Sequence, residues 1–167
     1  MIGRLRSGPF EELQTLYAGR IVPSPAIVEL EIRQRLPAAL LKEREAGLIL
    51  KALPPGVPLI ALDEHGASWS SRDFAAQIAL WRDRGAGEVA FAIGGAEGLG
   101  AAVLEHAQAT VSMGAMTWPH LLVRGMLLEQ LYRAQQILAG HPLSPGVSDV
   151  PHRHRCRGHL YRSRRGR

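Results

Sequence analysis

Two nearly uninterrupted apolar runs, residues 57–62 and 88–93, constrain the fold of this 167-residue chain more than any other feature. Such runs are typical of parallel strands that are buried on both faces. Segments with helical spacing of apolar residues lie around them, at 36–53, 72–84 and 99–107. Strands that alternate with helices at this pace predict βαβ units. The sequence therefore predicts an α/β fold in which helices cover both faces of a parallel sheet.

Further elements are expected on either side of these units. Pro9 begins a helix that runs to about Gly19, since proline suits the first helical turn. Apolar residues alternate with glutamates over 26–32, which predicts a half-buried strand. Residues 63–66 are expected to form a turn, and 110–113 a short strand.

Residues 114–119 can form neither regular helix nor regular strand, because they combine Gly114 with Pro119. They join the strand at 110–113 to a helix at 120–139. Ligands commonly bind at such turns in α/β proteins, since free main-chain groups converge there. A second turn, Gly-Gly-Ala-Glu-Gly at 94–98, is weak evidence alone, because tight strand-to-helix turns use the same residues. Its glycines come too late for a dinucleotide fingerprint, and no Gly-Lys-Ser/Thr follows them, so nucleotide phosphates are disfavoured.

The helix predicted at 120–139 is apolar on more than one side. Its large or apolar residues are Leu121, Leu122, Val123, Met126, Leu127, Leu131, Ala134 and Leu138. A surface this wide indicates a helix that is buried deep in the domain or packed against a second copy of the chain. The pattern is therefore suggestive of a homodimer.

His120 and Arg124 are the candidate catalytic residues. They lie four positions apart at the start of the same helix, so they share one face. The positive end of the helix favours a neutral imidazole at His120. The alternative interpretation is a histidine that caps the helix and an arginine on a solvated face.

Charge divides the chain into two parts. Residues 1–142 hold 13 basic and 14 acidic residues, a net charge of −1, whereas residues 143–167 hold seven arginines and one aspartate, a net charge of +6. The second part is mostly Pro, Gly, Ser, Arg and His, which cannot bury enough apolar surface to order itself. We expect a single domain over 1–142 and a basic, disordered tail over 143–167.

Neither a membrane nor a metal is expected as a partner. No apolar run approaches the roughly 20 residues of a membrane span, and no secretory signal pattern is present. A single cysteine, Cys156, fits a reducing compartment, so a cytoplasmic location is expected. In the tail, the spacing of His152, His154, Cys156 and His159 suits no common zinc site.

Three segments make the sequence recognisable: VAFAIGGAEGL at 89–99, MTWPH at 116–120 and LEQLYRA at 128–134. In this order and spacing they closely resemble the SPOUT-type methyltransferases that act on N3 of a pseudouridine in 23S rRNA of the large ribosomal subunit. The similarity runs from about residue 3 to residue 142. It implies an α/β fold with a C-terminal trefoil knot, a homodimer, S-adenosylmethionine as cofactor and the ribosome as partner.

Position by position, the resemblance implies a cofactor site made of Leu62, Gly94, Met113, Gly114, Ala115, Met116, Thr117 and Trp118. Methyl transfer to N3 requires loss of its proton and alignment with the methyl group, so a base and cations are needed near the acceptor. His120 is the candidate base, and Arg124 a candidate cation.

The sequence departs from the family pattern at both ends. Family members begin with a short strand that would precede Ile2, so this N-terminal strand is expected to be missing. They also end in a Tyr-His-basic sequence just after the position of Pro142, where this chain continues with Leu143-Ser144-Pro145. Two alternatives therefore stay open: a SPOUT methyltransferase that acts on another RNA, and a catalytically impaired protein that binds RNA or the ribosome.

Overall fold

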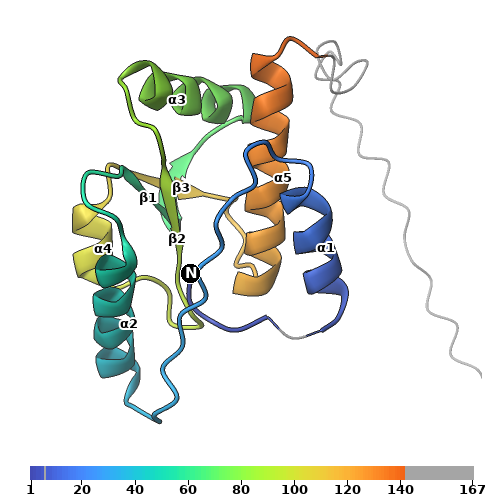
Figure 1. Ribbon diagram of the computed structural model, residues 1–167. Coiled ribbons are helices and arrows are strands. Elements are labelled where there is room, and N and C mark those ends of the chain that lie inside the picture. The colour runs from blue at the N-terminus through green and yellow to red at the C-terminus, as the bar shows by residue number, and fades with distance from the viewer. Residues whose placement is uncertain (6, 142–167) are drawn as a thin grey trace, which may run out of the picture.

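A computed structural model describes residues 1–5 and 7–141 of the chain. The elements within these residues are, in order, α1 (Pro9–Ala18), α2 (Ala38–Ala52), β1 (Leu59–Ser68), α3 (Ser71–Asp83), β2 (Ala90–Ile93), α4 (Ala101–His106), β3 (Ala109–Ser112) and α5 (His120–Leu138) (Figure 1). The tail predicted at 143–167 lies outside the described residues. No helix within the described ranges is both long and apolar enough to span a bilayer.

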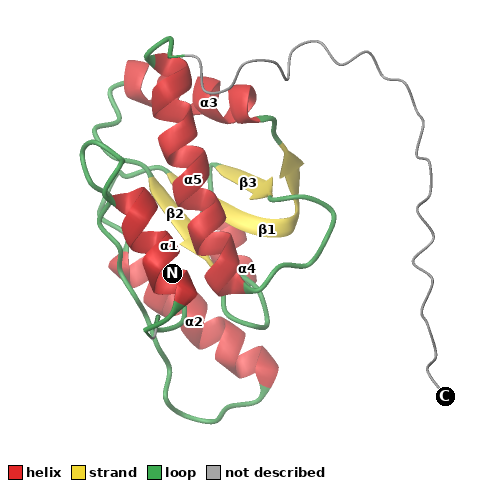
Figure 2. Ribbon diagram, turned by 90° about the vertical axis from the view of Figure 1, so that its right-hand side faces the viewer, coloured by secondary structure: helices red, strands yellow, loops and turns green. Residues whose placement is uncertain are grey.

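The three strands form a parallel sheet with β1 at its centre, in the order β2-β1-β3. Alternate residues of β1 enter two separate cores, because successive side chains of a strand point to opposite faces. Ile60 packs with α3 and α5 on one face, and Ala61 packs with α2 and α4 on the other. Helices lie on both sides of the sheet in Figures 1 and 2. The predicted α/β fold is confirmed, and double burial explains why the strands are apolar throughout.

β1 is longer than its apolar run, so the turn predicted at 63–66 is wrong. The strand leaves its pairing with β3 after Leu62 and resumes it at Ala67, and both of these residues face Val111. Residues 63–66 therefore bulge out of the ladder. Only a glycine at position 66 lets β1 come back close to β3, because a Cβ there would lie 2.6 Å from the main-chain nitrogen of Val111. The polar sequence suggested a turn because a local pattern does not show that the chain pairs again with the same strand.

The strand predicted at 26–32 is also wrong. Leu30 makes one isolated parallel bridge with Ile2, and Ile2 in turn donates from its N–H to the carbonyl of Ile93 at 3.0 Å. Residues 1–3 thus lie beside β2. The alternating sequence does not become a regular strand because it pairs with so short a segment.

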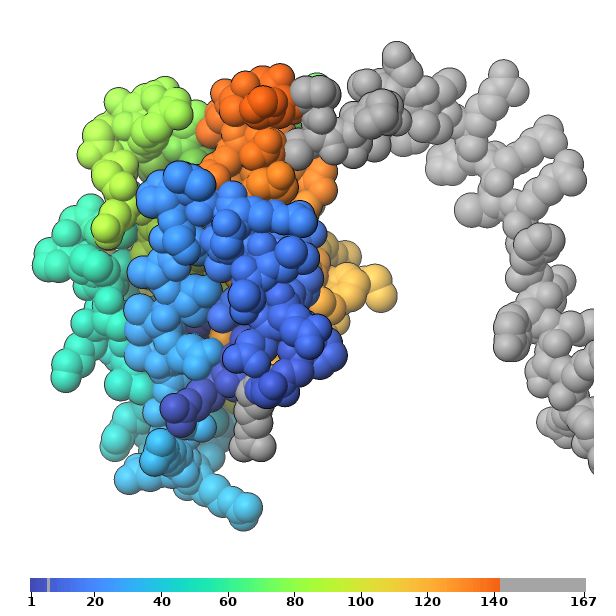
Figure 3. Space-filling view, turned by 45° about the vertical axis from the view of Figure 1, so that its right-hand side comes forward, coloured from blue at the N-terminus to red at the C-terminus, as the bar shows by residue number. Residues whose placement is uncertain are grey.

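Helix α5 packs against both α1 and α3, as predicted for a helix buried on more than one side. Its contact with α1 is close at Gly125, where a Cβ would lie 2.3 Å from Cδ2 of Leu13. Near the other end of α5, Gln135 accepts from the N–H of Val22 and donates to the carbonyl of Val22. Figure 3 shows the N-terminal residues covering this side of the molecule. The last helix therefore holds the first part of the chain in place.

Candidate functional site

Three segments meet at the carboxyl edge of the sheet. In the register of the strands, Leu62 pairs with Ile93 on one side and with Val111 on the other. The residues that follow these three are the bulge at 63–66, the glycine turn at 94–98 and the loop at 113–119. The strand pairing thus brings together the segments that carry the predicted cofactor residues, although these residues are far apart in the sequence.

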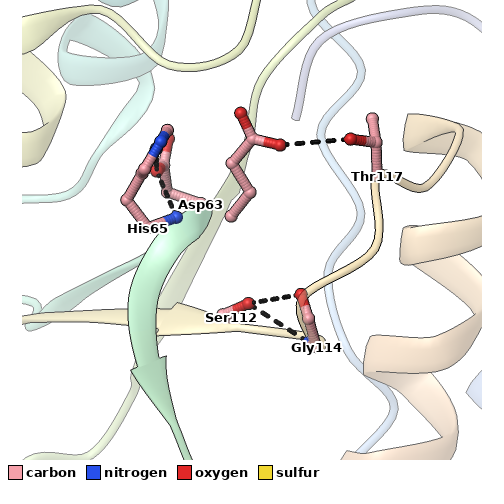
Figure 4. A network of polar contacts seen from close by, with 6 residues as sticks. Asp63, His65, Ser112, Gly114 and Thr117 are labelled. Carbon is pink, nitrogen blue, oxygen red and sulfur yellow. Dashed lines mark hydrogen bonds and ion pairs between the residues drawn. The ribbon is translucent and has the colours of Figure 1, made fainter.

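Polar contacts tie the loop after β3 to the bulge of β1 (Figure 4). Thr117 donates from its hydroxyl to a carboxylate oxygen of Glu64 at 3.2 Å. Ser112 fixes the start of the loop, since its hydroxyl accepts from the N–H of Gly114 at 3.1 Å and donates to the carbonyl of the same residue at 2.8 Å. Within the bulge, Asp63 accepts a hydrogen bond from the N–H of His65. The loop is therefore held at both of its ends.

The surface of this loop suits a flat, partly apolar ligand. Met116 is 68% exposed and Trp118 is 37% exposed, while Leu62 is buried at the base of the site. Among the described residues, the N–H groups of residues 115–118 donate to no other main-chain group. Apolar walls with free main-chain donors are what an adenine ring needs from a protein. The residues present therefore fit the nucleoside of S-adenosylmethionine.

The glycine turn after β2 is shaped by its own close packing. A Cβ on Gly94 would lie 2.5 Å from the carbonyl carbon of Gly98, and Gly98 itself has φ of +77°. The N–H of Gly98 donates to the carbonyl of Gly95 at 3.1 Å. These contacts explain the glycines without a ligand. The position of Gly94 next to Leu62 is what keeps it in the candidate site.

A carboxyl group that the sequence analysis did not identify lies beneath this turn. Glu45 of α2 is 7% exposed, and its Oε2 has no hydrogen-bond partner in the part of the chain that the structure describes. A Cβ on Gly95 would lie 3.0 Å from this oxygen. Burial, and secondarily the charge of Glu97, raises the pKa of Glu45. The signal in the sequence was a glutamate next to Ala46 and Ile49 on the apolar face of a helix.

His120 is the first residue of α5, and its ring is only partly exposed. A Cβ on Gly3 would lie 3.0 Å from Nε2 of His120, so the main chain of Gly3 lies against the ring. Burial lowers the pKa of His120, and the positive charge of Arg124 lowers it further. Both effects favour the neutral imidazole that the helix position suggested.

Arg124 is buried rather than solvated. It is 1% exposed, and its guanidinium donates to Glu29 at 2.6 Å and to the carbonyl of Gly3 at 2.9 Å. A third, longer hydrogen bond reaches Gln14 at 3.3 Å. The alternative interpretation, an arginine on a solvated face, is therefore wrong. Because three hydrogen bonds hold its guanidinium within the protein, we expect Arg124 to act through the residues it holds.

Comparison with known proteins identifies the family of this chain. A family described as "Predicted SPOUT methyltransferase" matches residues 1–143. The chain belongs to the SPOUT methyltransferase family. Relatives named ribosomal RNA large subunit methyltransferase H include one from Rhodospirillum centenum, 50% identical over 141 residues, and one from Methylocella silvestris, 51% identical over 151 residues. Each alignment covers 84% of this chain and 93% of the relative. The resemblance seen in the sequence is confirmed, while the trefoil knot stays a prediction.

Proposed function

We propose that this chain uses S-adenosylmethionine to methylate N3 of a pseudouridine in 23S rRNA of the large ribosomal subunit. The observation that carries the proposal is the meeting of Leu62, Gly94 and the 113–118 loop at one edge of the sheet of a SPOUT methyltransferase. The names of the relatives, which are large-subunit rRNA methyltransferases, support the choice of substrate.

The proposed cofactor residues divide between two tasks. Leu62 and the apolar side chains of Met113, Met116 and Trp118 would hold the adenine, with main-chain groups of Gly94, Gly114, Ala115 and Thr117 at its polar edges. When bound, S-adenosylmethionine supplies an electrophilic methyl group on a sulfonium. Since loop 113–119 is fixed by Ser112 and Glu64, it offers a preorganised surface for this binding.

His120 is the proposed general base. The N3–H of the base must be lost for the nitrogen to accept a methyl group, and a neutral imidazole can accept that proton. Because the pKa of His120 is lowered, its ring is unprotonated at neutral pH. Arg124 is proposed to act on the site without touching the RNA: its buried positive charge helps to keep His120 neutral, and its hydrogen bonds hold Gly3 near the ring. Shape, more than charge, would select the RNA, since residues 1–142 carry a net charge of −1.

The direct test is methylation of large subunits that lack the modification. We expect the purified chain to transfer labelled methyl groups from S-adenosylmethionine to N3 of one pseudouridine, which mass spectrometry of rRNA digests identifies. His120→Ala should abolish the transfer. His106→Ala is the matched control, because His106 ends α4, a helix that packs on the sheet face opposite α5. Near-normal turnover of His120→Ala would show that His120 is not the general base.

Other outcomes identify the alternatives. Calorimetry with S-adenosylmethionine measures binding without a need for RNA. A chain that does not bind this cofactor would contradict the proposal and favour a non-catalytic RNA-binding or ribosome-binding protein. Binding that is accompanied by methylation of a different RNA would favour a SPOUT methyltransferase with another substrate. The basic tail, which lies outside the described residues, would supply phosphate contacts in either case.

A further inference from the structure

The surroundings of Arg124 form a polar cluster whose members come from distant parts of the sequence. Its guanidinium joins Glu29, Gly3 and Gln14, which precede it by 95, 121 and 110 residues. A buried arginine is costly unless its donors are paired. This one is 1% exposed and has three partners from three separate segments. Such a cluster fixes the relative positions of those segments.

Gly3 is the member of the cluster that touches the proposed base. Its carbonyl accepts from Arg124, and its N–H donates to the carbonyl of Leu30 at 2.9 Å. Its φ of +94° is in the left-handed region that favours glycine. With both main-chain groups tied, Gly3 lies so close to the ring that a Cβ on it would be 3.0 Å from Nε2 of His120, tighter than an ordinary van der Waals contact. The position of Gly3 therefore limits where the imidazole can be.

Glu29 links Arg124 to the N-terminal segment that contains Gly3. One carboxylate oxygen, Oε1, accepts from Arg124 at 2.6 Å and from the N–H of Leu5 at 3.0 Å. Burial alone would raise the pKa of Glu29, but the hydrogen bonds from Leu5 and Arg124 outweigh it and lower the pKa. Glu29 is therefore ionised at neutral pH. It holds the arginine and the start of the N-terminal loop at the same time.

We infer that Glu29 is a positioning residue, which acts through Arg124 and Gly3 to fix the place of the His120 ring in the site. The inference deepens the proposed function and rests on it. Arg124, on the same helix, is the charged group that acts on the His120 ring directly. Glu29, on the segment that follows α1, acts on Arg124, and Arg4 and the amino group of Met1 belong to the same charged cluster. Glu29 is the acidic partner of Arg124 at 2.6 Å, so we expect its removal to strengthen the field of Arg124 at the imidazole.

The test uses Glu29→Gln, with Glu31→Gln as the matched control. Glu31 lies on the same segment and pairs with Arg33 at the surface, at 3.5 Å. NMR titration of His120, assigned with His120→Gln, measures the pKa of the ring in each variant. Loss of the negative charge of Glu29 leaves Arg124 uncompensated, which disfavours the imidazolium. We therefore expect the pKa of His120 to fall in Glu29→Gln and to stay at the wild-type value in Glu31→Gln.

Methylation kinetics give the second measurement. We expect a loss of roughly tenfold in kcat for Glu29→Gln with little change in the KM for S-adenosylmethionine, since misplacing a reacting group by about 1 Å can cost about 100-fold. Glu31→Gln should keep the wild-type kcat. Equal His120 titrations in the two variants would overturn the inference. If the wild-type chain does not methylate rRNA, the proposed function fails, and the titration still decides the role of Glu29.

A third variant applies if Glu29→Gln does not fold, as judged by its thermal melt. Gly3→Ala places a Cβ against His120 and leaves the charges of the cluster intact. We expect the imidazole resonances of His120 to shift in this variant, because the ring must move away from the new methyl group. Unchanged His120 resonances would show that Gly3 does not limit the ring, and would overturn the inference.

Discussion

Glu45 is a residue whose substitution should stabilise the protein. Its carboxyl is buried under the 94–98 turn without a partner for Oε2, and leaving such a group unpaired costs about 1–3 kcal/mol. Glu45→Met keeps the volume and removes the polar atoms. We expect its free energy of unfolding at pH 7 to rise by about 1 kcal/mol, as measured by urea denaturation.

The same substitution should lose most of its advantage in acid. Because the pKa of Glu45 is raised in the folded protein, ionisation above that pKa weakens the fold, and protonation below the ordinary glutamate pKa of about 4.3 removes this penalty. The gain from Glu45→Met should therefore be smaller at pH 4 than at pH 7. Glu43→Met, at an exposed position of the same helix, is the control. An equal gain in stability at pH 4 and pH 7 would show that ionisation of Glu45 does not weaken the fold.

At the scale of single residues, the sequence predicted the segments of a candidate site that the strand register brings to one edge of the sheet, but not the surroundings of its charged groups. Leu62, Gly94 and loop 113–118 follow from a resemblance that spans the whole site, and strand register brings them together. Arg124 was placed on a face with His120, which is a matter of helical spacing. Its burial could not be predicted, because its partners Glu29 and Gly3 lie about a hundred residues away and no local pattern encodes their approach.

Among the elements, β1 depends on a single glycine for its second pairing with β3. Gly66→Ala would place a Cβ 2.6 Å from the main chain of Val111, so β1 could not resume its pairing with β3. We expect a loss of about 1–3 kcal/mol in the free energy of unfolding, as for other overpacked sites. Gly47→Ala, in the exposed part of α2 with open space around it, should instead gain up to about 1 kcal/mol from helix propensity. Equal stability of Gly66→Ala and Gly47→Ala would contradict the close approach of Gly66 to Val111.

The elements themselves were largely predictable where the pattern was long. The helix predicted at 72–84 is present as α3, and its start has a full capping box of Ser70 and Asp73. The errors lie where pairing between distant segments decides the outcome. The bulge of β1 at 63–66 resembles a turn in its composition, and residues 26–32 alternate like a strand but meet only a short partner. In both places local propensity was overridden by tertiary context.

For the whole molecule, we expect two copies of the chain to associate. Leu138 is 40% exposed, and Leu121, Leu122 and Met126 of the same helix are only half-buried within one chain. Apolar surface left on a long helix is typical of an interface. Sedimentation equilibrium at micromolar concentration should give twice the chain mass of 18.2 kDa. A mass of one chain under these conditions would contradict the homodimer.

The attachment of the N-terminal residues to α5 has a consequence for the order of folding. Gly3 is held by Arg124 and Val22 by Gln135, across separations of 121 and 113 residues. Closing so long a loop is entropically costly, and contacts of this kind slow folding. During translation the N-terminus leaves the ribosome first, while α5 is made more than a hundred residues later. The contacts of the N-terminal segment with α5 can therefore form only after this last helix has been synthesised, and the same holds for the surroundings of His120.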